Sequence, residues 1–361
     1  MNPPFTPDTL RPYLEAVHGA PVQAVQVRAL AGGASGDKGY GYGIALRVDY
    51  RLAGEARSAV LETVRAGPFG HEHMADRAQA LLWAHGAFAQ LPRHVRSLDV
   101  GAVRADGSLL ALGDAEEFFI VTAFAEGREY AADLQRLRHG APLAQLDLAR
   151  ADALCDYLAE IHRRRGPDPG LYVRRVRELV GHGECIFGIA DSYPLPCGFI
   201  TPQRLLQIEQ RCVAWRWKLK SSTHRLRQVH GDFHPWNILF REGVDFTALD
   251  RSRGEWGEPA DDLACLTLNY LFFALQRQGR LEGAFEILFR RFWDRYLERS
   301  ADREMLEVIA PFYAFRALVV ASPVWYPTLD ESVRRRLFNF LEAVLDEARF
   351  DPARVNAYCG A

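Results

Sequence analysis

The sequence predicts an α+β protein with two lobes, a small β-rich lobe followed by a larger α-helical one. From about residue 21 onwards the chain alternates apolar and polar residues and is rich in β-branched side chains, which is typical of antiparallel strands. After Glu126-Gly127 the apolar residues recur at helical spacing instead. Because 361 residues are enough for two such units, we expect lobes that comprise residues 1–124 and 125–361, with a ligand in the cleft between them.

The N-terminal lobe is predicted to open with a short helix and to continue as strands. Thr6-Pro7 is typical of a helix N-cap with proline at the first helical position, and Leu10, Leu14 and Val17 continue the helical spacing. A glycine-dense turn, Gly32–Gly39, separates the first two strands. The expected strands cover 22–30, 42–50, 57–65, 97–104, 108–112 and 117–124, and a helix covers 72–86.

The second lobe is predicted to be mostly helical. Its apolar residues follow the helical period over eight segments, interrupted by two short strand-like pieces, Ile238–Phe240 and Phe246–Leu249. The expected helices cover about 129–138, 146–164, 171–182, 201–218, 259–277, 281–298, 302–320 and 329–348.

The composition excludes several classes of protein. Apolar residues make up 48% and charged residues 25%, which is ordinary for a globular chain and excludes collagen-like, fibrous and disordered proteins. The net charge of −2 lacks the basic surplus that a nucleic-acid partner requires, so we expect none. The longest apolar run, Leu263–Leu275, is interrupted by Thr267 and Asn269 and is shorter than the roughly 20 residues of a membrane span.

The location is predicted to be the cytoplasm. The N-terminal residues show no basic start followed by an apolar stretch, so no signal peptide is expected. The six cysteines are widely scattered and none forms a C-x-x-C pair, so we expect reduced thiols rather than disulfides.

One region has the residues that phosphoryl transfer requires. The sequence reads His-Gly-Asp-Phe-His-Pro-Trp-Asn at 230–237, and Asp250 follows the two short strands. Phosphoryl transfer needs a carboxylate that accepts the proton of the attacking hydroxyl, oxygen ligands for Mg²⁺ and positive charge near the transferred group. Asp232, Asn237 and Asp250 supply one base and two metal ligands in that chain order.

The pattern resembles the aminoglycoside phosphotransferase family. The resemblance rests on His-Gly-Asp-x-His-x-x-Asn at 230–237, on Asp250, and on Gly-x-Pro-x-x-Asp-Leu-Ala at 257–264. This family belongs to the protein-kinase-like group, together with choline, homoserine, methylthioribose and fructosamine kinases. The resemblance implies a bilobal kinase-like fold and transfer of the γ-phosphoryl group of ATP or GTP to a small-molecule hydroxyl, with Mg²⁺ as cofactor.

The resemblance also assigns roles within this region. It implies that Asp232 is the catalytic base and that Asn237 and Asp250 hold Mg²⁺. It implies that His230 and His234 hold the loop by hydrogen bonds rather than act as bases. The resemblance makes Asp262 a support for the loop from the helix that follows.

Nucleotide contacts are implied for the first lobe. The family's turn over the phosphates corresponds to the glycine-dense turn, and its hinge strand corresponds to Phe118–Gly127. The residues assigned to the nucleotide are therefore Gly32, Gly33, Ser35 and Lys38 in the turn, Arg77, and the backbone of Thr122, Ala123 and Phe124.

The first lobe departs from the family at one pair of charges. Glu62 stands where the family has a lysine on the third strand, and Arg77 stands where it has the partner glutamate. We expect a charge-swapped ion pair between Glu62 and Arg77, with Arg77 or Lys38 supplying the positive charge for phosphate.

The acceptor is predicted to bind the larger lobe. Glu255, Glu258 and Asp261 favour a cationic acceptor such as an amino sugar or amino alcohol, and a solvated loop is the alternative. The aromatic residues Trp256, Tyr270, Phe272 and Phe273 either wall a pocket or pack the core.

Other functions remain open at this stage. The missing strand lysine is compatible with a nucleotide-binding pseudokinase or regulatory module, or with an altered nucleotide pose. The intact Asp232, Asn237 and Asp250 favour a working enzyme. A protein kinase is disfavoured because Gly257-Glu258-Pro259 follows Asp250 too closely for a long activation loop.

Overall fold

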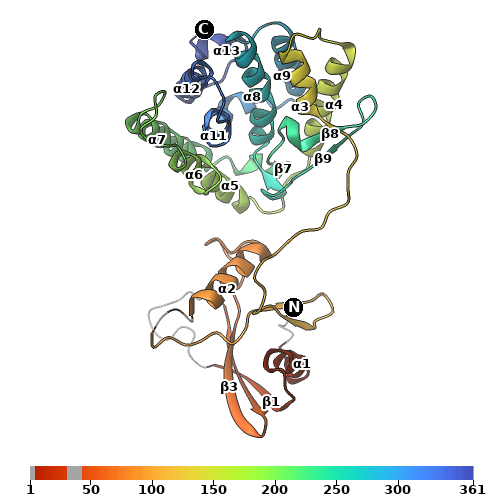
Figure 1. Cartoon of the computed structure of the whole chain (residues 1–361), viewed down its shortest axis with the longest axis vertical. Coiled ribbons are helices and arrows are strands. Elements are labelled where there is room, and N and C mark those ends of the chain that lie inside the picture. Colours follow the sequence, from red (N-terminus) through yellow and green to blue (C-terminus); the bar gives the residue numbers. More distant parts are fainter. Residues whose placement is uncertain (1–4, 31–42, 89, 91, 361) are drawn as a thin grey trace. The chain divides into compact units, whose positions relative to one another are not determined.

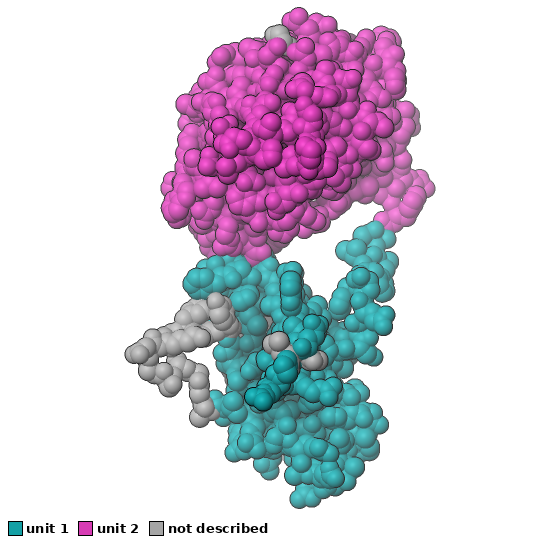
Figure 2. Space-filling view, turned by 60° about the vertical axis from the view of Figure 1, so that its left-hand side comes forward, with its two compact units in different colours: residues 1–122 teal, residues 123–361 magenta. Residues whose placement is uncertain are grey.

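The computed structural model describes residues 5–30, 43–88, 90 and 92–360. The chain divides into two units, Met1–Thr122 and Ala123–Ala361, which are coloured separately in Figure 2. This division lies next to the predicted boundary after residue 124. The two units are described in turn, each by itself.

Unit 1 contains a three-stranded antiparallel sheet. Its order is β1-β2-β3, and a separate hairpin pairs β4 with β5. Ala53 and Gly54 both have positive φ angles, 49° and 84°, as the tight turn between β2 and β3 requires. The elements of unit 1 are α1 (Pro7–His18), β1 (Val22–Ala29), β2 (Ala45–Leu52), β3 (Glu55–Glu62), α2 (Met74–Phe88), β4 (Gly101–Val103) and β5 (Leu109–Ala111).

Helix α1 closes the small core of unit 1. It begins as the sequence predicts, because the Thr6 hydroxyl accepts a hydrogen bond from the backbone N–H of Thr9 and Pro7 follows the cap. Its buried Leu10 and Leu14 pack with apolar residues of β1 and β2. Helix α2, by contrast, has no buried residue.

The predicted strand over 117–124 is not formed. These residues have no regular secondary structure, and Phe119, Ile120, Val121 and Phe124 are each more than 80% exposed. An alternating apolar pattern shows that a segment could bury one face, but a strand also needs a neighbouring strand for its backbone hydrogen bonds. No described strand pairs with this segment.

Unit 2 is built around helix α8 (Pro259–Gln278). Residues 259–275 of α8 are all buried, and Figure 1 shows the helix between α9 and α11. Short strands form two further sheets, β6-β8-β9 and β7-β10. The remaining helices of unit 2 are α3 (Tyr130–Arg138), α4 (Gln145–Ile161), α5 (Gly170–Gly181), α6 (Ile186–Asp191), α7 (Pro202–Leu219), α9 (Gly283–Ser300), α10 (Met305–Val308), α11 (Ala310–Ala321), α12 (Glu331–Asp346) and α13 (Val355–Tyr358). Its strands are β6 (Arg128–Glu129), β7 (Arg227–Gln228), β8 (Ile238–Phe240), β9 (Phe246–Ala248) and β10 (Trp256–Gly257).

Most elements of unit 2 agree with the sequence prediction. The two strand-like pieces form β8 and β9, which pair as an antiparallel hairpin. The helix expected over 302–320 is divided into α10 and α11, because Pro311 has no N–H with which to continue α10. The six-residue α6 was not predicted, since it is too short to show a helical period.

Two further observations concern the chain as a whole. All six cysteines are free thiols. Among the described residues, no helix combines the length and the apolar character that a membrane span needs.

Candidate active site

The loop 230–237 is held by the first turn of α8. The carboxylate of Asp262 accepts the backbone N–H groups of His230 at 2.8 Å and Gly231 at 2.7 Å, and its Oδ2 lies 3.1 Å from Nε2 of His162. Asp262 is fully buried. Burial by itself raises the pKa of this carboxyl, but the hydrogen bond and charge of His162 outweigh it and lower the pKa below its ordinary value. The carboxylate is therefore ionised and fixes the start of the loop.

Both histidines of the loop are bonded to the loop's own backbone. Nδ1 of His230 accepts the N–H of Asp232 at 3.2 Å, and Nδ1 of His234 accepts the N–H of Trp236 at 3.2 Å. This is the hydrogen-bonded geometry that a support role requires. Gly231 has a φ of 88°, which favours glycine at the turn before Asp232.

The carboxylate of Asp232 faces positive charge. Its Oδ1 accepts a hydrogen bond from Nη1 of Arg316 at 2.5 Å, and its Oδ2 lies 3.8 Å from Nε2 of His234. Burial acts to raise the pKa of Asp232, but the positive charges of Arg316, Arg253 and His234 outweigh it and lower the pKa. Asp232 is therefore ionised at neutral pH, which is the state in which a carboxylate can accept a proton.

The hairpin of β8 and β9 brings Asn237 and Asp250 to the same end. The backbone carbonyl of Asn237 accepts the N–H of Leu249 at 2.8 Å, so Asp250 is the next residue along the opposite strand. Nδ2 of Asn237 donates to the backbone carbonyl of Asp232 at 3.1 Å, which leaves its Oδ1 as an acceptor. Asp250 is exposed and has a φ of 54°, an uncommon backbone conformation for a residue with a side chain.

This donor set fits Mg²⁺. An amide oxygen and a carboxylate are hard oxygen ligands, and Mg²⁺ commonly takes one or two protein ligands together with water and substrate phosphates. Among the described residues, no group of three or more His, Cys, Asp or Glu side chains could enclose a metal ion. Asn237 and Asp250 therefore suit an ion that nucleotide phosphates also hold.

The predicted nucleotide contacts are only partly described. Gly32, Gly33, Ser35 and Lys38 lie outside the described residues. Residues Thr122 to Phe124 are exposed, and their backbone groups make no hydrogen bond with other described residues. Their N–H and C=O groups are thus available to a ligand.

The predicted ion pair between Glu62 and Arg77 is absent from the structure. Nη1 of Arg77 donates instead to the backbone carbonyls of His71 at 3.0 Å and Glu72 at 3.2 Å. Arg77 lies in the first turn of α2, so its side chain folds back over the segment that precedes the helix. Glu62 lies at the end of β3 and is exposed.

Two of the three predicted acceptor carboxylates are buried and paired. Glu258 accepts hydrogen bonds from Arg225 at 2.7 and 2.8 Å and from the Tyr172 hydroxyl at 2.8 Å. Asp261 accepts from Arg316 at 2.6 and 3.1 Å. Their charges are neutralised within the protein, which corrects their assignment to a cationic acceptor and leaves only the exposed Glu255.

Sequence reasoning missed Arg316. This residue lies on α11 and joins Asp232 to Asp261, although 84 positions separate it from Asp232. A signal was present, because Arg316 is the only charged residue in the sequence of α11. A lone arginine in an apolar helix needs a buried anion.

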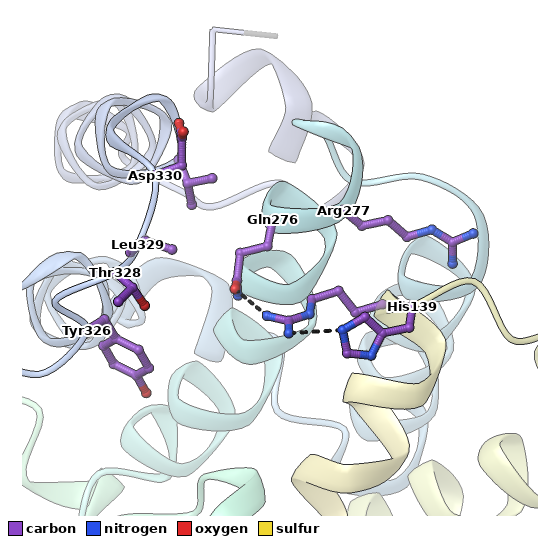
Figure 3. Close-up of a pocket in the computed structure, with 9 residues that line it drawn as sticks. His139, Gln276, Arg277, Tyr326, Thr328, Leu329 and Asp330 are labelled. Atoms are coloured by element: carbon purple, nitrogen blue, oxygen red, sulfur yellow. Dashed lines mark hydrogen bonds between the residues drawn. The ribbon is translucent and has the colours of Figure 1, made fainter.

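A separate cavity of about 450 Å³ lies at the far end of α8 (Figure 3). The arginines at this cavity are bonded to neutral groups: Arg138 donates to Oε1 of Gln276, and Arg277 donates to the carbonyl of Leu137. Tyr326 lines the cavity, and its ring lies 6.4 Å from that of Trp236 in the loop 230–237. None of the predicted site residues lines this cavity. The residues that line it are Arg138, His139, Gln276, Arg277, Tyr326, Thr328, Leu329, Asp330 and Val333.

The aromatic residues of α8 named in the sequence analysis belong to the core. Tyr270, Phe272 and Phe273 of α8 are buried and pack with other apolar residues of unit 2. Of the two alternatives, core packing is the one that the structure shows.

The fold and the site together define a kinase-like phosphotransferase, in which a loop presents an ionised aspartate next to an amide and a second carboxylate. The comparisons with known proteins name the family. A model of the phosphotransferase enzyme family (APH) matches residues 43–299, and the chain therefore belongs to this family. This confirms the predicted family and the predicted class of enzyme, a phosphotransferase. The α+β composition that the sequence predicts is present in the structure.

Solved structures show further likenesses. The amicoumacin kinase hAmiN is 17% identical, with 91% of this chain and 92% of that chain covered and a TM-score of 0.42. A putative aminoglycoside phosphotransferase from Ralstonia eutropha JMP134 is 13% identical, with 95% and 98% covered and a TM-score of 0.41. The choline kinase from Cryptosporidium parvum is 10% identical, with 93% and 86% covered and a TM-score of 0.33. No match was found among curated proteins.

Proposed function

We propose that this protein transfers the γ-phosphoryl group of ATP, or of GTP, to a hydroxyl group of a small molecule, with Asp232 as the catalytic base. The observation that supports this proposal most directly is the ionised Asp232 on a loop that also presents Asn237. The side-chain amide of Asn237 is bonded to the backbone of Asp232, and its own backbone is bonded to the strand that leads to Asp250.

The residues of unit 2 have distinct parts in the proposed reaction. Asp232 accepts the proton of the acceptor hydroxyl as its oxygen attacks the γ-phosphorus. Asn237 and Asp250 hold Mg²⁺, which neutralises charge on the phosphates when it is bound. His230, His234 and Asp262 keep the loop in place.

The nucleotide contacts and the acceptor are proposed in less detail than the base and the metal ligands. The backbone of Thr122 to Phe124 is our proposal for the adenine contact. The amicoumacin kinase hAmiN was solved with AMP-PNP and Ca²⁺, which supports a nucleotide together with a divalent cation here. The argument for a cationic acceptor now rests on Glu255 alone, so the acceptor is proposed only as a small molecule with a hydroxyl group.

A thermal-shift titration with ATP, GTP and ADP, each with and without Mg²⁺, tests the nucleotide part of this proposal. A ligand that binds only the folded protein stabilises it, by about 2.7 kcal/mol at 100 times its Kd. We expect a rise in Tm that depends on Mg²⁺ and that is lost in Asp250→Ala. The control is Asp245→Ala, which removes an exposed carboxylate of the same hairpin that pairs with Arg241. The absence of any shift in the wild type would contradict the proposal.

Slow hydrolysis of ATP tests the chemical part. With water as acceptor, Asp232→Asn should lower turnover by about 10²–10⁴-fold, the usual contribution of a positioned base. The Mg²⁺-dependent thermal shift should remain, because Asp232 is not a metal ligand. Nucleotide binding without turnover in the wild type would favour a pseudokinase or regulatory module instead.

A further inference from the structure

Helix α11 places one arginine in an apolar environment next to the proposed base. The helix has the sequence Ala-Pro-Phe-Tyr-Ala-Phe-Arg-Ala-Leu-Val-Val-Ala, and Arg316 is 6% exposed. A buried guanidinium is costly unless all of its charge is paired and hydrogen-bonded. The groups that pair with Arg316 therefore indicate its role.

All three guanidinium nitrogens of Arg316 donate to groups around the proposed base. Nη1 donates to Oδ1 of Asp232 at 2.5 Å, and Nη2 donates to the backbone carbonyl of Gly231 at 2.8 Å. Nε and Nη2 both donate to Oδ1 of Asp261, at 3.1 and 2.6 Å. The guanidinium also lies over the ring of Phe315, 4.6 Å from its centroid. One planar group thus joins the carboxylate of Asp232, the backbone before it and the first turn of α8.

The two oxygens of Asp232 are made unequal by this contact. Oδ1 is occupied by Arg316, and the thiol of Cys265 lies 3.9 Å from the same oxygen. The nearest side-chain nitrogen recorded for Oδ2 is Nε2 of His234 at 3.8 Å, which is beyond hydrogen-bond distance. Among the described residues no hydrogen bond to Oδ2 is recorded, so Oδ2 keeps the capacity to accept one from an acceptor hydroxyl.

Two other buried arginines of unit 2 have different partners. Arg334 of α12 is 3% exposed and donates to backbone carbonyls of the segment 321–329. Arg225 pairs with Glu258 and Asp302. Neither contacts the loop 230–237 by a recorded hydrogen bond, so Arg334 serves as a matched control for Arg316.

We propose that Arg316 is a positioning residue for the base, and that Asp261 acts through it. Arg316 holds Oδ1 of Asp232, so that Oδ2 accepts the proton. In this step the hydroxyl oxygen forms a bond to the γ-phosphorus, the O–H proton passes to Oδ2, and the bond between the γ-phosphorus and the bridging oxygen breaks to release ADP or GDP. The proposal rests on the proposed function and adds an orienting residue from a helix outside the sequence motif.

An arginine suits this task better than a lysine. The planar guanidinium fork of arginine donates hydrogen bonds from three nitrogens in fixed directions. The ammonium group of lysine is a point charge on a flexible stem. A displacement of about 1 Å from productive geometry can cost roughly 10²-fold in rate. Arg316→Lys keeps the charge but not the fork, so its activity reports on positioning.

The experiment compares Arg316→Lys, Arg316→Met and Arg334→Lys in slow ATP hydrolysis and in Mg²⁺·ATP binding, each per folded protein. We expect Arg316→Lys to lower kcat by about 10-fold and Arg316→Met by roughly 10²-fold, with the Kd for Mg²⁺·ATP unchanged within about twofold. Arg334→Lys should lower Tm but leave kcat per folded protein unchanged. Equal kcat in the wild type and Arg316→Lys would overturn the proposal.

A double-variant cycle separates positioning from a purely structural role. In an Asp232→Asn background, Arg316→Lys should have no further effect on kcat, because there is no base left to orient. A full additional loss would overturn the proposal. If Arg316→Met does not fold, Asp261→Asn takes its place and should lower kcat less than Arg316→Lys does. A wild type without turnover would refute the proposed function itself, whereas an active wild type with an equally active Arg316→Lys would refute only the positioning role.

Discussion

Unit 1 and unit 2 bury their residues to very different extents. Among the described residues of unit 1, the core consists of six buried apolar residues from α1, β1 and β2, and α2 adds none. In unit 2, α8 alone is buried without interruption over residues 259–275. The groups proposed for chemistry belong to unit 2, whereas most of the predicted nucleotide contacts belong to unit 1. The proposed base is therefore held by a large packed core, and the nucleotide is assigned to more exposed elements.

The two units also use charge differently. In unit 1, the ion pair of Arg57 with Glu55 has both side chains more than half exposed, and the side chains of Arg28 and Asp49 are 62% and 27% exposed. In unit 2, Arg225 with Glu258 is almost completely buried, and Arg316 lies between two carboxylates. Exposed pairs contribute little to stability because water screens them, whereas breaking a buried pair leaves an uncompensated charge. The same residue types should thus respond very differently to mutation.

The largest expected effect is the loss of Glu258. Glu258→Ala removes both hydrogen bonds from Arg225 and the cap at the start of α8, where Glu258 accepts the N–H of Ala260. We expect unit 2 to lose about 3–5 kcal/mol of unfolding free energy, measured by urea denaturation. Glu55→Ala is the matched change in unit 1 and should have little effect. Similar losses in the two variants would contradict the contrast between buried and exposed charge.

Acidification should lower the stability of unit 2 more than that of unit 1. The loss in unit 2 should be smaller than the loss caused by Glu258→Ala. Burial lowers the pKa of His234 below its ordinary 6.5, so the unfolded chain binds a proton more readily than the folded one. The stability from this group is complete above pH 6.5 and is lost as the pH falls below it. Asp262 has a lowered pKa, so its contribution is complete above its ordinary pKa of 3.8 and is lost at lower pH.

Urea unfolding between pH 8 and pH 3 checks this dependence. His234→Gln should flatten the loss of unit 2 stability below pH 6.5, while His139→Gln, at an exposed histidine of the same unit, should leave it unchanged. Asp49 and Asp106 in unit 1 also have lowered pKa values, caused mainly by hydrogen bonds from Ser58 and Ser108, but Asp106 is exposed and Asp49 is only partly buried. A steeper acid loss in unit 1 would contradict the prediction.

Sequence reasoning succeeded where the relevant interactions are local. The order of the helices and the strands β8 and β9 follow from periodicity within each segment. The loop 230–237 is a contiguous motif, and the hydrogen bonds of His230 and His234 link residues only two positions apart. Such short-range patterns leave a direct record in the sequence.

Sequence reasoning failed where the structure of a segment depends on a partner far away in the sequence. The strand over 117–124 needed a neighbouring strand, and Arg77 found nearer backbone acceptors than Glu62. Glu258 and Asp261 looked like a free acidic patch because their partners, Arg225 and Arg316, lie 33 and 55 positions away. A single sequence gives the charges but not which of them neutralise one another.

The smallest expected effect is the loss of a helix N-cap, and the same kind of cap occurs in both units. Thr6 and Thr201 each precede a proline at a helix start, and each hydroxyl accepts a backbone N–H three residues on, at 3.3 and 3.2 Å. Replacing either threonine by alanine should cost about 1 kcal/mol. The shift in Tm should nevertheless differ, because the entropy of unfolding scales with the number of residues, at roughly 2.1 cal/mol/K per residue.

Unit 1 spans residues 1–122 and unit 2 spans 123–361, so unit 2 has about twice the unfolding entropy. Thr6→Ala should therefore lower the Tm of unit 1 by about 4 °C, and Thr201→Ala should lower that of unit 2 by about 2 °C. Differential scanning calorimetry measures both shifts, and hydrogen exchange assigns each transition to its unit. Threonine-to-serine variants keep the hydroxyl and should shift neither transition appreciably. If both alanine variants move one common transition by the same amount, the two units unfold together, because a shared transition has a single unfolding entropy.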